Sequence, residues 1–186
     1  MNVTIIAGSN RKDAASTKAL RHIANLLELK GMQVTFIDLF ETPLPFYLPD
    51  EEQSHDPGVA RFRRTVEAAD GIVLGTPEYH GSISGVLKNA IDHLSGGLVK
   101  GKPVLTLSAS GGPVGVSSLT QLQVIIRNLH GINSPEWISV GGNVQLFAAD
   151  NTPLQEGLRQ RMDRAVSMFT MLLMQLRGEA VESGWH

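Results

Sequence analysis

The chain has 186 residues, with a hydrophobic fraction of 42 %, a charged fraction of 18 % and a formal net charge of −2. This length and composition are typical of one globular domain that buries its own core. The small net charge, and the lack of a basic run among aromatic residues, argue against nucleic acid or a membrane as a partner. Cysteine is absent, which excludes disulfides, thiol catalysis and cysteine metal sites, so redox chemistry would require a bound cofactor.

The N-terminal sequence MNVTIIAG lacks the basic residues of a signal peptide and predicts a buried strand instead. No apolar run approaches the length that crossing a bilayer requires. We therefore expect a cytoplasmic protein.

Short apolar runs alternate along the chain with segments of helical periodicity. In chain order we predict a strand at residues 3–7, a helix at 16–30, a strand at 34–39, a long proline-rich and acidic loop at 41–57, a helix at 58–69, a strand at 71–75, a helix at 83–94, a strand at 103–108, a helix at 116–129, a strand at 137–140 and a closing helix at 153–176.

This alternation predicts an α/β domain over residues 1–186: a doubly wound, five-stranded parallel sheet with helices on both faces. The expected strand order is 2-1-3-4-5. Sheets of this kind bind ligands beyond the carboxyl ends of the strands, where the strand order reverses. The loops after the first, third and fourth strands are therefore the candidate site.

The first of these loops reads Gly8-Ser9-Asn10-Arg11, and Ser16-Thr17 opens the helix that follows. Free N–H groups at a helix start, hydroxyls and an arginine suit an anion. The loop has neither the G-x-x-x-x-G-K-[ST] nor the G-x-G-x-x-G pattern, so one terminal phosphate fits it better than a triphosphate. The alternative is an ordinary turn in which Asp13 or Ser16 caps the helix and Arg11 faces solvent.

The other two loops suit a flat ring. Residues 76–82 (TPEYHGS) contain Tyr79 and His80, which could stack on a planar cofactor. Residues 108–113 (SASGGP) are small enough to let the backbone approach a ligand closely. Each loop could also be a plain turn or connection.

These motifs, with the run TPEYHGSISGVLKNAIDHL at residues 76–94, resemble the NADPH-dependent FMN reductase family, and the resemblance extends along the whole chain. It implies a flavodoxin-like fold that binds FMN. This sequence departs from the family pattern at position 80, where it has histidine and many members have asparagine. The implied cofactor residues are Ser9, Arg11, Ser16 and Thr17 for the phosphate, Pro77, Glu78, Tyr79, His80 and Gly81 for the isoalloxazine, and Ser110, Gly111 and Gly112 for its pyrimidine edge.

We therefore expect an FMN-dependent oxidoreductase that takes electrons from NADPH or NADH and passes them to a flavin, quinone, azo compound or metal oxyanion. Because the cofactor carries the chemistry, we assign no catalytic side chain. The resemblance also implies a homodimer or homotetramer. The alternatives are a reductase of one metabolite that residues 41–57 would trap, and a flavodoxin-like electron carrier, for which a charge of −2 is a poor match.

The six histidines show no metal-ligand spacing, so we assign no metal. Asp92 and His93 stand side by side and could suggest acid–base chemistry. Their position late in the predicted helix 83–94, distant from the strand ends, favours a solvent-facing or subunit-interface role instead.

Overall fold

A parallel sheet forms the centre of the molecule. The computed structural model describes residues 1–50, 56–112, 114–142 and 145–178. The sheet has the order β2-β1-β3-β4-β5, and β6 also pairs with β4. Its strands are β1 (Asn2–Ala7), β2 (Gln33–Asp38), β3 (Gly71–Pro77), β4 (Pro103–Ser110), β5 (Ile132–Asn133) and β6 (Ile138–Gly141).

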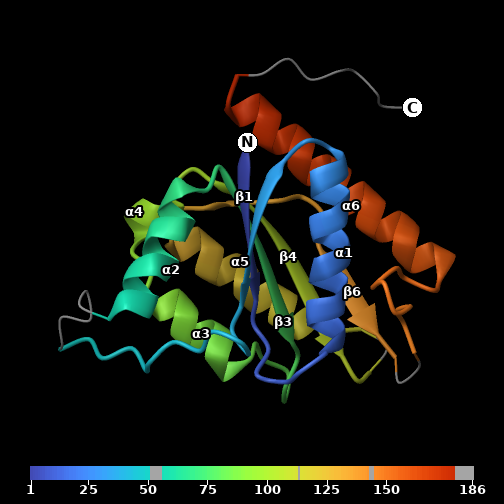
Figure 1. Cartoon of the computed structure of the whole chain (residues 1–186), viewed down its shortest axis with the longest axis horizontal. Helices are drawn as coiled ribbons and strands as arrows, with labels where there is room; N and C mark the ends of the chain where they lie inside the picture. Colours follow the sequence, from blue (N-terminus) through green and yellow to red (C-terminus); the bar gives the residue numbers. More distant parts are fainter. Residues whose placement is uncertain (51–55, 113, 143–144, 179–186) are drawn as a thin grey trace.

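Helices cover both faces of the sheet (Figure 1). They are α1 (Ala15–Leu29), α2 (Pro57–Ala68), α3 (Gly85–Asp92), α4 (Gly96–Val99), α5 (Val116–Asn128) and α6 (Glu156–Leu176). The strand order confirms the predicted doubly wound fold. Within the described ranges, none of the helices combines the length and apolarity that crossing a membrane requires.

The prediction differs from the structure at the far edge of the sheet and in one connection. The expected fifth strand at residues 137–140 is β6, and a further two-residue strand, β5, precedes it. The four-residue helix α4 was also not predicted. Both elements are too short to show a hydrophobic period, so pairing with β4 and packing on the core determine them rather than local pattern.

Two apolar layers separate the sheet from its helices. Val3 and Ile5 of β1 belong to the layer shared with α1 and α6, whereas Ile6 belongs to the layer shared with α2, α3 and α5. Successive strand residues point to opposite faces, so a strand buried on both faces is apolar throughout. This explains why the central strands appear as continuous apolar runs in the sequence.

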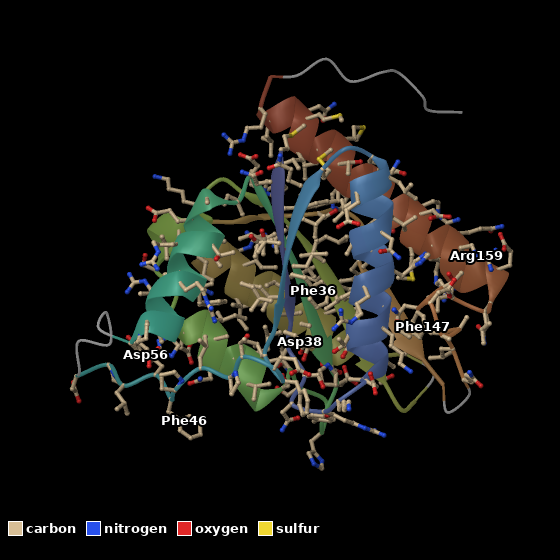
Figure 2. All side chains as sticks on the ribbon, viewed as in Figure 1. Phe36, Asp38, Phe46, Asp56, Phe147 and Arg159 are labelled. Atoms are coloured by element: carbon tan, nitrogen blue, oxygen red, sulfur yellow. The ribbon has the colours of Figure 1, made fainter. Side chains whose placement is uncertain are left out.

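The strand β2 forms one edge of the sheet. Arg21 of α1 lies over the ring of Phe36, 4.9 Å from its centroid, and its guanidinium is 3.5 Å from the carboxylate of Asp38. Figure 2 shows Phe36 along this edge and Asp38 near its lower end. The positively charged Arg21 side chain therefore packs against the edge strand β2.

The loop that follows β2 is fixed to α3 by Asn89. The Tyr47 N–H donates to Asn89 Oδ1 at 2.8 Å, and Asn89 Nδ2 donates to the Pro45 carbonyl at 2.9 Å. Between these contacts Phe46 projects outward (Figure 2). Residues 51–55 of the predicted loop lie outside the described ranges, and Pro57 already belongs to α2.

The expectation that His93 faces solvent or a subunit interface was wrong. The His93 side chain is buried beneath the same loop, with Nε2 3.0 Å from the Pro45 carbonyl and its ring edge-on to Tyr47. Asp92, by contrast, pairs with Lys88 one turn earlier at 2.7 Å. The described contacts of both residues are thus with α3 and with the loop after β2.

A buried histidine makes stability depend on pH. His22 of α1 is buried and its Nε2 has no hydrogen-bond partner. Burial is the main cause that lowers the pKa of His22 below its ordinary value near 6.5; Asp163 and Asp150 oppose the shift, and Arg159 adds to it. The folded protein therefore holds this imidazole neutral at a pH where the unfolded chain already takes up a proton.

We predict that the free energy of unfolding falls as the pH falls below about 6.5, with a slope from this group of at most about 1.4 kcal/mol per pH unit. His22→Leu should reduce this fall because it removes the group that only the unfolded state protonates. Thermal melts of both proteins between pH 7.5 and pH 5 measure the effect. Parallel melting curves across that range would show that His22 does not cause the pH dependence.

Candidate functional site

The register of the central strands brings three loops to one edge of the sheet. Ala7 of β1 pairs with Gly75 of β3, and Pro77 of β3 pairs with Ala109 of β4. The loops after β1, β3 and β4 consequently meet at the lower edge in Figure 1. All of the predicted site residues lie in these loops, at the ends of their strands or in the first turn of α1, so the structure brings together the parts that the sequence proposed.

The first loop is held tightly against the start of α3. The Gly8 N–H donates to the Gly75 carbonyl at 2.7 Å, and the Ser84 hydroxyl donates to the Gly8 carbonyl. A Cβ at position 8 would lie 2.6 Å from the Cβ of Leu87, so only glycine fits. Ser84 also caps α3 by accepting from the Leu87 N–H. This fixes the loop from behind.

The start of α1 has no side-chain cap. Its N-cap residue is Ala14, so the alternative in which Asp13 or Ser16 caps the helix is wrong. The hydroxyls of Ser16 and Thr17 are buried and have no hydrogen-bond partner. The helix N–H groups and these hydroxyls are donors that lack an acceptor, so the start of α1 is a candidate anion site, called here the anion cradle.

Ser9 and Arg11 complete the first loop. Ser9 is fully buried, and its Oγ accepts from the Arg11 N–H at 3.1 Å. This bond folds the loop back towards the helix start. The Arg11 side chain is exposed, where it can close over a bound phosphate.

The second loop makes a tight two-residue turn. Tyr79 and Ser82 exchange backbone hydrogen bonds of 3.0 Å, and His80 and Gly81 between them have φ angles of 53° and 72°. Asparagine and histidine tolerate this left-handed region better than most residues. The backbone conformation at position 80 is therefore compatible with histidine and with the asparagine that many family members have.

The third loop presents a bare backbone. The Gly112 carbonyl accepts from Ser110 Oγ at 3.0 Å and from the Gly142 N–H at 2.9 Å. A Cβ at Gly112 would meet no described atom within 4 Å, so the space beside it is open. Gly111, Gly112 and the turn residues 79–81 are all exposed. A flat ring can therefore reach the backbone of both loops.

The carboxylate of Glu78 does not project freely towards that space. Its Oε2 accepts from both the N–H and the hydroxyl of Ser118 in α5. Gln121, one turn further along α5, bonds to Ser82 and to Gly81. Sequence reasoning missed Ser118 and Gln121 because no motif marks them, whereas Ser84 carried a usable signal as a serine before an apolar helix.

In the part of the chain that the structure describes, no group of three or more histidine, aspartate and glutamate residues could hold an ion.

The strand order β2-β1-β3-β4-β5, with helices on both faces, is that of the flavodoxin-like fold. A profile of the NADPH-dependent FMN reductase family matches residues 1–145, and the chain belongs to this family. Membership confirms the resemblance drawn from the sequence motifs. It also confirms the assignment as an NAD(P)H-dependent oxidoreductase that uses FMN.

Individual relatives agree with this family. The chain is 38 % identical over 143 residues to an FMN-dependent NADPH-azoreductase of Staphylococcus haemolyticus strain JCSC1435, covering 75 % of this chain and 76 % of the relative. It is 34 % identical over 146 residues to the enzyme of that name from Staphylococcus aureus strain USA300, with the same coverage. Among solved structures, FerB, a flavoenzyme NAD(P)H:(acceptor) oxidoreductase from Paracoccus denitrificans, superposes with a TM-score of 0.78 at 25 % identity, covering 94 % of this chain and 97 % of FerB.

We predict that Ser16→Ala weakens FMN binding by about ten- to a hundredfold, because a bond to a charged phosphate is worth about 1.5–3 kcal/mol. Arg11→Ala should have a similar effect. Riboflavin, which lacks the phosphate, should bind parent and variants alike. Because the Ser16 hydroxyl has no partner in the apoprotein, Ser16→Ala should leave the apoprotein melt unchanged or slightly raised. Equal affinities of the parent for FMN and riboflavin would contradict phosphate binding at the anion cradle.

We predict that His80→Asn retains FMN binding and most activity, since asparagine also adopts a positive φ. His80→Val should weaken FMN binding, because a β-branched residue strains this conformation by about 1–3 kcal/mol. Dissociation constants and steady-state rates of the two variants measure the difference. A fall in kcat of about a hundredfold in the asparagine variant, with FMN still bound, would instead indicate proton transfer by the imidazole.

Proposed function

We propose that the protein holds FMN across these three loops and uses NADPH to reduce flat aromatic acceptors, with azo compounds as the leading class. The observation that carries the cofactor assignment is the uncapped start of α1 with its two buried, unpartnered hydroxyls. The azoreductase activity for which the staphylococcal relatives are named supports the choice of acceptor.

Each loop has its own part in holding the cofactor. Side chains after β1 bind the phosphate, the backbone and rings after β3 support the isoalloxazine, and the backbone after β4 meets its pyrimidine edge. The proposed residues are Ser9, Arg11, Ser16, Thr17, Pro77, Glu78, Tyr79, His80, Gly81, Ser110, Gly111 and Gly112.

Bound FMN supplies the redox chemistry by accepting a hydride from the nicotinamide and passing the electrons to the second substrate. The chain's own residues orient the ring system, and backbone N–H groups of the third loop stabilise negative charge at its pyrimidine edge. No described side chain needs to move a proton. The ring of Tyr79, 42 % exposed on the turn, offers an aromatic face to a flat acceptor.

The remaining assignments complete this proposal. We propose that residues 1–186 form one FMN-binding domain, that the protein acts in the cytoplasm, and that it assembles as a homodimer or homotetramer. The small negative charge favours an enzyme over an electron carrier that docks through an acidic surface.

The purified protein, reconstituted with FMN, should oxidise NADPH steadily when an azo dye is present and bleach the dye in step. Absorbance at the NADPH and dye maxima measures both processes in one cuvette. A protein without FMN serves as the control. Flavin reduction that stops after a single turnover with every quinone, azo dye and free flavin offered would contradict an enzyme and favour the carrier.

A further inference from the structure

We propose that Glu78 and Gln121 are positioning residues that fix the turn at residues 79–82 in its binding conformation before FMN arrives. This inference rests on the FMN site proposed above and names residues that act on it from behind. Neither side chain needs to touch the cofactor.

Glu78 joins the turn to the start of α5. Its Oε2 accepts from the Ser118 N–H and from Ser118 Oγ, both at 2.9 Å, and its own N–H donates to the Ala109 carbonyl at 2.8 Å. Ser118 is the third residue of α5, and the N-cap residue Gly115 offers no side-chain bond to the helix. Glu78 thus caps α5 from a distant loop, where its negative charge also suits the helix dipole.

Gln121 holds the other end of the same turn. Its Oε1 accepts from Ser82 Oγ at 2.8 Å, and its Nε2 donates to the Gly81 carbonyl at 3.0 Å. Residues three apart on a helix share a face, so Ser118 and Gln121 present their contacts to the loop side by side. One face of α5 therefore bonds to Glu78, which precedes the turn, and to Gly81 and Ser82 at its end.

The turn needs such support because of its backbone. His80 and Gly81 both have positive φ angles, and both are exposed. The left-handed backbone at His80 is less favourable for a residue other than glycine, so contacts from the surrounding structure help to keep the turn in this conformation. With the turn already ordered, FMN binding does not have to order it, and affinity rises accordingly. Without the contacts from α5, FMN binding would have to order the turn, which would lower the affinity. The bound ring system would also be held less firmly in one orientation.

If Glu78 did no more than cap α5, the expected results would differ. Replacing it would change the stability of the apoprotein and leave the properties of bound FMN unaltered in the folded fraction. The absorbance bands and fluorescence of bound flavin report the contacts around the ring, so they separate positioning from stability.

The experiment compares Glu78→Ala, Glu78→Gln and Gln121→Ala with the parent. The matched control is Asn133→Ala, which removes a bond of 3.1 Å from Asn133 Nδ2 to the Gln123 carbonyl on the same helix α5, away from the turn. For each protein we would measure the FMN dissociation constant, the spectrum of bound FMN and the melting of the apoprotein.

We expect Glu78→Ala to weaken FMN binding by about ten- to a hundredfold and to shift the bound spectrum, the size expected for lost bonds to a charged group. Gln121→Ala should weaken binding by about three- to tenfold. Glu78→Gln, which keeps an acceptor for Ser118, should restore binding to within about threefold of the parent. Asn133→Ala should lower the melt without changing the affinity or the spectrum.

Three results would overturn the proposal: parent-like affinity and spectrum in Glu78→Ala and Gln121→Ala, no rescue by glutamine at position 78, or an equal loss of affinity in the Asn133 control. If the parent itself does not bind FMN, the proposed function fails instead. The two failures are therefore distinguishable.

Discussion

Parallel pairing of β1 with β3, and of β3 with β4, sets the position of every loop in the candidate site. Ala7 lies beside Gly75 and Thr76 beside Ser108, so the chain leaves all three strands at one level. The absence of a side chain at Gly8 lets the first loop approach Leu87 closely, and Ser84 bonds to the Gly8 carbonyl across that contact. A shift of register by one residue between two of these strands would move the loop after one strand away from the loop after its neighbour.

The site keeps polar groups that the fold itself leaves unused. Ser16 and Thr17 are buried with free hydroxyls at a helix start that has no side-chain cap. Buried polar groups without partners oppose folding, which is why native proteins contain few of them. Here they gather where an anion would satisfy them. By contrast, the turn after β3 exposes its backbone, and its side-chain contacts come from α5, where Ser118 bonds to Glu78 and Gln121 bonds to Gly81.

Local patterns were sufficient for the layers of the fold and for the placement of the loops. Apolar runs such as residues 71–75 predicted buried strands, and the turn residues of TPEYHGS at residues 76–82 marked the loop that follows β3. The pattern could not reveal β5, which has two residues, or the buried environment of His93, which depends on contact with Pro45, 48 residues away. The partner of Glu78 was also hidden, because Ser118 is 40 residues distant and carries no motif. These features depend on tertiary contacts between distant residues, which a local sequence pattern does not contain.

The bond between Ser84 and Gly8 has a consequence for biosynthesis. Its two residues are 76 positions apart, and the pairing of β1 with β3 spans a similar separation. During translation the loop after β1 leaves the ribosome first, and its contacts with Gly75 and Ser84 cannot form until β3 and the start of α3 have followed. Contacts of such long range form slowly compared with helices and hairpins. A nascent chain that stops before Ser84 therefore lacks the bond that joins the first loop to the start of α3.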